Sequence, residues 1–129
     1  MKLRVRFAET DQMGIAHHSA YVVWLEAARV EWLRDRGVSY RELEDEGVSL
    51  AVSQVSIDYR RSLCFDDEVT IDTTLSVAKS RRFRYDYRLT RGDDLIALAS
   101  TLHTPMDRTG RAIRFPQKWF DRLVDDMPS

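Results

Sequence analysis

The sequence predicts a single α+β domain in which a curved antiparallel β-sheet wraps around one long central helix. Residues 19–36 form an almost uninterrupted apolar segment of helical length, and a helix that is apolar on nearly every side is expected to be buried on nearly every side. Between residues 50 and 104, apolar and polar residues alternate in four segments at the spacing of antiparallel hairpins. One face of the sheet must therefore cover the helix, and the 129 residues fit one domain, 1–129.

The N-terminal part of the chain is expected to hold a strand, a turn and two helices. Alternation over residues 3–7 predicts a short first strand with one buried face, and a turn follows at residues 10–14. Ser19 is the expected N-cap of the long helix, because its hydroxyl can accept a backbone N–H of the first turn. Gly37 is the expected helix stop, since glycine readily takes the left-handed conformation found there. A second, short helix is expected over residues 40–46.

The rest of the chain is expected to form the sheet and a last helix. The four strands with a period of two are 50–59, 69–77, 83–89 and 96–104. The alternation in the first of these strands holds only if a bulge lies near residues 53–54. In the last of them, the even-numbered residues from Ile96 to Thr104 carry the alternation. A short strand is expected at residues 111–115, and Pro116 is expected to begin a helix that runs to about Val124.

One stretch, ETDQMGIAHHSAYVVWLEAAR, holds residues suited to chemistry. Asp11 lies in the turn, and Gly14 lets the backbone turn tightly. His17 and His18 come just before the expected N-terminus of the long helix. A helix N-terminus offers free N–H groups and a partial positive charge, so a carboxylate and a polarised carbonyl group can meet there. Thr-Asp-x-x-Gly is also ordinary turn chemistry, so a purely local role for Asp11 stays open.

This stretch resembles the acidic-residue motif of hotdog-fold acyl-CoA thioesterases, the group of 4-hydroxybenzoyl-CoA thioesterase and YbgC-like enzymes. The resemblance implies a hotdog fold and hydrolysis of an acyl-CoA to a carboxylic acid and CoA, without a cofactor. It implies that Asp11 is the nucleophile or the general base, and that the backbone N–H of His18 polarises the thioester carbonyl. The substrate-binding residues that it implies are Gly14, His17 and Tyr21.

A second stretch, AKSRRFRY, resembles the basic turn with which the same family holds the phosphates of CoA. The residues implied are Lys79, Arg81, Arg82 and, just before AIRFP, Arg111. Guanidinium and ammonium groups bind phosphate well, although a solvated turn is the ordinary alternative. The resemblance also implies a homodimer whose two sheets join edge to edge, often paired again into a homotetramer. The acyl chain would then lie at the dimer interface.

Two other functions stay open. An acyl-carrier-protein thioesterase would hold the same pantetheine arm without a nucleotide. A non-catalytic acyl-CoA-binding module would make Asp11 dispensable, because a fold does not fix a function.

Several classes of protein are disfavoured by the composition. A net charge of −1 argues against nucleic-acid binding. The sequence contains no apolar run of about 18 residues, so no membrane span is predicted. The lone Cys64 gives no disulfide framework, which fits a cytoplasmic location. The three histidines lack metal-ligand spacing, so no metal site is predicted.

Three further residues are expected to have structural roles. His103 is expected to be structural, and Glu26 and Arg29 are expected to pair with each other or with a partner subunit.

Overall fold

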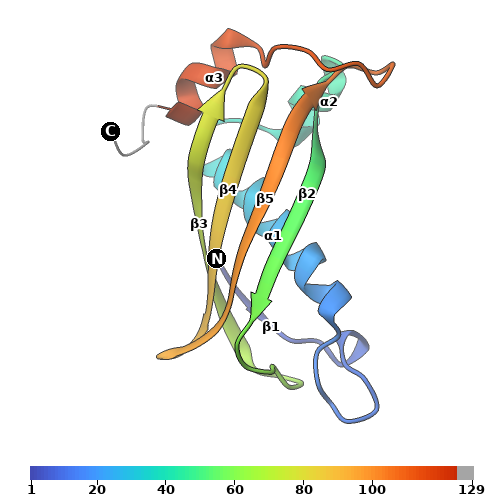
Figure 1. Cartoon of the computed structure of the whole chain (residues 1–129), viewed down its shortest axis with the longest axis vertical. Coiled ribbons are helices and arrows are strands. Elements are labelled where there is room, and N and C mark those ends of the chain that lie inside the picture. Colours follow the sequence, from blue (N-terminus) through green and yellow to red (C-terminus); the bar gives the residue numbers. More distant parts are fainter. Residues whose placement is uncertain (125–129) are drawn as a thin grey trace.

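The computed structural model describes residues 1–124, in which a five-stranded antiparallel sheet curves around one long helix (Figure 1). The strands are β1 (Lys2–Arg4), β2 (Ser49–Tyr59), β3 (Glu68–Lys79), β4 (Arg82–Arg91) and β5 (Asp94–Met106), in the spatial order β1-β3-β4-β5-β2. The helices are α1 (His18–Asp35), α2 (Tyr40–Asp45) and α3 (Gln117–Val124), and a 3-10 turn, η1, covers Phe7–Glu9. The predicted α+β architecture is confirmed.

Helix α1 is buried on one side only. The side chains that face the sheet are Ala20, Tyr21, Trp24, Leu25, Ala28, Trp32 and Leu33. On the other side, Val22 and Val23 are 44% and 54% exposed. The prediction that this helix is buried nearly all round is wrong, because the single curved sheet covers only one face of the helix. The predicted stop is confirmed: Gly37 has a φ of +74°, and the Val38 N–H donates to Leu33 O over 3.0 Å.

The first strand is shorter than predicted. It ends at Arg4, and residues 7–9 form the 3-10 turn, with the Phe7 side chain 75% exposed. The Arg6 N–H donates to Glu9 Oε1 over 2.8 Å, so a local hydrogen bond replaces a sheet bond there. The strand expected at 111–115 is also wrong, because only one isolated bridge forms in that segment.

The sheet follows the predicted strands with one change of face. The bulge in β2 is confirmed, since its register against β5 shifts between Val52 and Gln54. In β5, the side chains at odd positions from Ala97 to Pro105 are buried, whereas Leu98 is 36% exposed. The even-numbered alternation was misleading because Ala97, Ala99 and Thr101 are small enough to lie beneath the helix.

A row of polar side chains runs through the core between α1 and the sheet. Arg29 Nη1 donates to the Tyr87 hydroxyl at 3.2 Å, and that hydroxyl is 2.7 Å from Thr101 Oγ1. His103 Nε2 is also 2.7 Å from Thr101 Oγ1. Within residues 1–124, Arg29 makes no ion pair with Glu26; it bonds to Tyr87 instead. His103 is 1% exposed, as expected of a structural residue, and burial lowers its pKa to about 4.

Burial of His103 predicts a loss of stability in mild acid. Below pH 6.5 the unfolded chain binds a proton at this histidine, whereas the folded protein does so only near pH 4. The free energy of unfolding should therefore fall as the pH drops from 6.5 to 4, by roughly 3 kcal/mol in all. Urea unfolding at several pH values should show this slope in the wild type and a shallower one in His103→Gln. Equal slopes in the two proteins would contradict this role for His103.

Candidate active site

Asp11 lies in a closed loop, residues 10–17, that joins η1 to α1. The Asp11 N–H donates to Ile15 O over 2.8 Å, and the Gly14 N–H donates to Asp11 O over 3.0 Å. Gly14 has a φ of +76°, in the left-handed region that favours glycine. The Phe65 N–H donates to Gly14 O over 3.1 Å and ties the loop to the segment before β3. The backbone thus fixes the position of Asp11 from both sides.

The Asp11 carboxylate is exposed and ionised at neutral pH. Its Oδ1 accepts the backbone N–H of Met13 at 2.8 Å and that of Ile15 at 3.1 Å. These two hydrogen bonds hold the pKa of Asp11 below its ordinary value, and the bond from Ile15 has the larger effect. The nearby His17 lowers the pKa of Asp11 further. Within residues 1–124, Oδ2 has no hydrogen-bond partner. This oxygen can accept a proton or attack an electrophile.

The N-terminus of α1 follows this loop directly. His17 is the N-cap residue, and its side chain makes no capping hydrogen bond to the helix. The predicted cap, Ser19, is instead the second helical residue. The difference arises because the His17 N–H donates to Glu9 O over 2.8 Å, which holds His17 extended just before the first turn. Within residues 1–124, the backbone N–H groups of His18 and Ser19 donate to no other group, so they can donate to the oxygen of a ligand at the positive end of the helix.

A hollow of about 150 Å³ lies beside this helix end. His18, Tyr21 and Tyr59 form part of its wall. The His18 ring stacks on the Tyr59 ring with 4.0 Å between centroids, and Tyr21 meets Tyr59 edge to face at 4.9 Å. Burial raises the pKa of Tyr21 to about 12, so its hydroxyl stays protonated in the physiological range. The hollow thus offers an aromatic wall next to the free N–H groups.

Tyr59 is a site residue that sequence reasoning missed. Its hydroxyl also donates to His18 O at 3.4 Å, from 41 residues along the chain. The sequence gives it the period of Val55 and Ile57, which marks it only as a strand residue. Its contact with α1 exists because the curvature of the sheet brings the end of β2 to the start of the helix.

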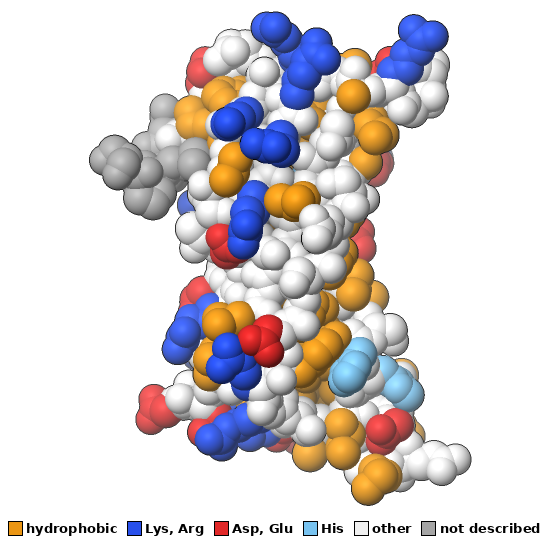
Figure 2. Space-filling model, in the orientation of Figure 1, with side chains coloured by type: hydrophobic (Ala, Val, Ile, Leu, Met, Phe, Trp, Pro, Cys, Tyr) orange, Lys and Arg blue, Asp and Glu red, His pale blue; other side chains and the backbone are white. Residues whose placement is uncertain are grey.

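The basic residues predicted to bind phosphate lie at the opposite end of the sheet. They are Lys79, Arg81, Arg82 and Arg111, all of them exposed. The turn between β3 and β4 holds the first three, and the segment that contains Arg111 lies beside it, since the Phe115 N–H donates to Ser80 O. Figure 1 shows this turn and the Asp11 loop at opposite ends of the sheet. Figure 2 shows Lys and Arg side chains at the turn end and a second group of them at the other end of the molecule. The 12 residues of β3 alone span roughly 36 Å.

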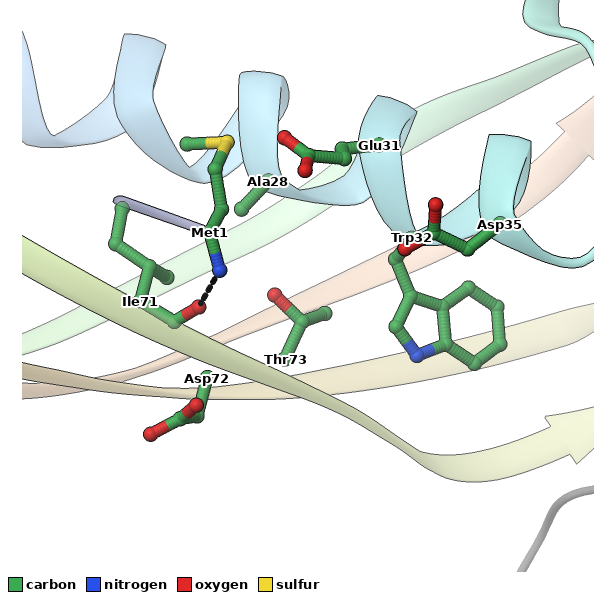
Figure 3. A pocket seen from close by; sticks show the side chains of 8 residues that line it. All are labelled: Met1, Ala28, Glu31, Trp32, Asp35, Ile71, Asp72 and Thr73. Atoms are coloured by element: carbon green, nitrogen blue, oxygen red, sulfur yellow. Dashed lines mark hydrogen bonds between the residues drawn. The ribbon is translucent and has the colours of Figure 1, made fainter. Parts of the chain in front are cut away.

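A second hollow, of about 180 Å³, lies between α1 and β3 and contains none of the predicted residues (Figure 3). Three carboxylates line it, those of Glu31, Asp35 and Asp72. The Met1 amino group there donates to Ile71 O over 3.0 Å. An acidic wall of this kind repels phosphate groups, so this hollow does not suit a CoA nucleotide.

Neither a metal site nor a membrane span is found in the described part of the chain. No group of three or more His, Cys, Asp or Glu side chains in residues 1–124 is arranged to hold a metal ion. None of the helices α1, α2 and α3 is both long and apolar enough to cross a bilayer.

The fold and this site define a class of protein. A five-stranded antiparallel sheet curved around one long helix is the hotdog fold of thioesterases. The chain matches the thioesterase-like superfamily over residues 5–123 and belongs to this family. It is a thioester hydrolase.

Known relatives agree over most of the chain. A protein of Aquifex aeolicus, described provisionally as an esterase, is 32% identical over 122 residues, which cover 95% of this chain and 94% of that protein. The acyl-CoA thioesterase YbgC of Haemophilus influenzae is 28% identical over 99 residues, covering 76% of this chain and 73% of the relative.

Solved structures share the fold throughout. The hypothetical protein TT1821 from Thermus thermophilus superposes with a TM-score of 0.92 and 37% identity, covering 96% of this chain and 95% of that one. Slr0204, a 1,4-dihydroxy-2-naphthoyl-CoA thioesterase from Synechocystis, gives a TM-score of 0.89 at 24% identity, covering 99% and 97% of the two chains, and shows the fold alone.

The conformation of Gly14 predicts a graded response to substitution. A Cβ at this position meets no atom within 4 Å, so the cost comes from the positive φ and not from a clash. Gly14→Ala should therefore destabilise the protein by about 1–2 kcal/mol, and Gly14→Asn by less, because Asn tolerates the left-handed region. Urea unfolding of the two variants measures the difference. A larger loss in Gly14→Asn than in Gly14→Ala would contradict the assignment of strain to the backbone.

Proposed function

We propose that this protein hydrolyses acyl-CoA thioesters to a carboxylic acid and CoA, with Asp11 as nucleophile or general base. The observation that carries the proposal is the Asp11 loop: backbone hydrogen bonds fix an ionised carboxylate in the loop that leads into the N-terminus of α1, where the N-cap residue His17 gives no side-chain cap. The names of the relatives support CoA as the thiol, since YbgC of Haemophilus influenzae is named an acyl-CoA thioesterase. Gly14, His17 and Tyr21 would line the substrate-binding region.

The proposed chemistry uses the helix end to activate the thioester. The carbonyl oxygen accepts the backbone N–H of His18, and the positive end of α1 stabilises the negative charge that develops on this oxygen. Asp11 Oδ2 then either attacks the carbonyl carbon or takes a proton from a water molecule that attacks it. In both routes the C–S bond breaks and CoA leaves as a thiolate, which takes up a proton. In the first route, water then hydrolyses the acyl–Asp11 anhydride.

We further propose that the protein works as a homodimer joined along β2. This 11-residue strand is an edge of the sheet: it pairs with β5 on one side, and no strand within residues 1–124 pairs with the other. Val52, Val55 and Tyr59 are 45%, 39% and 36% exposed along it. A long, apolar open edge needs a cover, and a second β2 in antiparallel orientation supplies one. A dimer of dimers, the homotetramer that the family resemblance implies, would leave this pairing unchanged.

Such a dimer would also complete the substrate site. In one protomer, the length of β3 separates the Asp11 loop from the basic turn 79–82, which exceeds the reach of a pantetheine arm and its diphosphate. Antiparallel pairing along β2 turns the partner end for end. The partner's basic turn would then lie at the Asp11 end, where it can hold the CoA phosphates. The acyl chain would lie between the two protomers.

The role of Asp11 predicts a large loss of rate without a loss of structure. Asp11→Asn keeps an oxygen for the N–H groups of Met13 and Ile15 but removes the charge. Thiol release from a panel of aromatic and aliphatic acyl-CoAs should fall by roughly 10²- to 10⁴-fold. Because the pKa of Asp11 is lowered, wild-type kcat/KM should stay level from neutral pH down to about pH 5 and fall only below about pH 4.

The outcomes of this assay separate the candidate functions. Equal rates in wild type and Asp11→Asn would contradict a catalytic Asp11. Binding of acyl-CoA without thiol release, measured by calorimetry, would favour a binding module. Release only from an acylated carrier protein would favour the carrier-protein thioesterase.

The composite site predicts complementation between two inactive variants. The first is Asp11→Ala and the second replaces Lys79, Arg81 and Arg82 by Ala. A mixed dimer of the two would contain one site with both sets of residues intact. Its kcat/KM at low acyl-CoA concentration should therefore recover to about half of the wild-type value. Mixed dimers purified through two different affinity tags provide the measurement. No recovery above the two parent variants would mean that the site does not span the protomers.

A further inference from the structure

Glu9 holds a nearly buried carboxylate beside the Asp11 loop, although its side chain is not part of the hollow. This side chain is 9% exposed. Its Oε2 accepts the Trp24 indole N–H over 2.7 Å, and its Oε1 accepts the Arg6 backbone N–H over 2.8 Å. The Arg6 guanidinium lies 3.3 Å from Oε2 and balances the charge. Both carboxylate oxygens therefore accept hydrogen bonds from N–H donors.

These bonds connect the two ends of the loop. Trp24 lies on the buried face of α1, nearly two turns after His18, and is 4% exposed. The backbone of Glu9 makes a second link to the helix, because its carbonyl accepts the His17 N–H over 2.8 Å. Glu9 is thus hydrogen-bonded to Trp24 of α1 through its side chain and to the N-cap residue His17 through its backbone carbonyl. Asp11 follows only two residues later in the chain.

We infer that Glu9 is a positioning residue for the thioester hydrolysis: its bond to Trp24 sets where Asp11 stands relative to the N–H groups at the start of α1. This inference rests on the proposed function. The Asp11 carboxylate is exposed and bonds only to backbone N–H groups of its own loop, and the loop is tied to residues 63–65 by backbone bonds, whereas α1 is fixed in the core. A link from the core helix to the residue just before the loop transmits that rigidity to Asp11. A displacement of a reacting group by about 1 Å can cost up to 100-fold in rate.

The test uses two conservative substitutions that remove the same bond. In Glu9→Gln, the amide has one oxygen and one NH₂ group, so it must turn a donor against either Trp24 or Arg6. In Trp24→Phe, a smaller aromatic ring stays in the core, and the indole N–H is gone. Each variant should lower kcat by about tenfold, and KM should stay within about twofold, since substrate contacts are unchanged.

The double variant distinguishes positioning from a general loss of stability. When Glu9→Gln is combined with Trp24→Phe, the NH₂ group of the introduced amide can turn toward the phenyl ring, and the amide oxygen can still accept the Arg6 N–H. The double variant should therefore be no slower than either single variant, whereas independent effects would multiply. Glu46→Gln is the matched control, because it breaks the 2.6 Å ion pair with Lys118 far from the loop. Its kcat should equal that of the wild type.

All rates are measured well below the melting temperature of each variant, with folding checked by circular dichroism. An active wild type together with wild-type kcat in Glu9→Gln would overturn the positioning role and leave the proposed function intact. Multiplicative losses in the double variant would also overturn it. A wild type that releases no thiol from any acyl-CoA would overturn the proposed function and, with it, this inference.

Discussion

The packing of α1 against the concave face of the sheet is the constraint on which the rest of the structure depends. Tyr21, Trp24 and Leu25 are each less than 5% exposed, and burial of one such side chain contributes about 1.5–3 kcal/mol. The helix is therefore fixed in direction and in depth. Its N-terminus, with no side-chain cap, is held at one end of the sheet beside the last residue of β2. The site is built outward from that fixed point.

The same packing leaves two consequences on the surface. Because the loop before α1 is closed by its own backbone and tied to the segment before β3, the position of Asp11 within residues 1–124 is set by backbone hydrogen bonds. Because β2 is an open edge next to that end, the hollow lined by His18 and Tyr59 borders the surface where a second protomer would join. The proposed dimer and the proposed site thus depend on the same edge.

Local patterns predicted much of this from the sequence, and long-range contacts supplied the rest. The period of two gave the strands, and the apolar run gave α1 with its stop at Gly37. The motif with Asp11 and Gly14 is local, so the loop was predictable. The exposed face of α1 was missed because a pattern cannot show how far one sheet reaches around a helix. Tyr59 and Glu9 were missed because each contacts a residue far along the chain: Tyr59 bonds to His18, 41 residues away, and Glu9 bonds to Trp24, 15 residues away. The separation of the turn 79–82 from Asp11 follows from strand length, which a motif does not encode.

The most direct test is a structure of the protein with an acyl-CoA analogue in which a CH₂ group replaces the thioester sulfur. This analogue keeps the carbonyl group but cannot be hydrolysed. We expect the carbonyl oxygen to accept the His18 N–H, with Asp11 Oδ2 facing the carbonyl carbon. We also expect the phosphates to lie against the turn 79–82 of the other protomer. A carbonyl group bound away from the start of α1, or a nucleotide held by the same protomer, would contradict the proposed site.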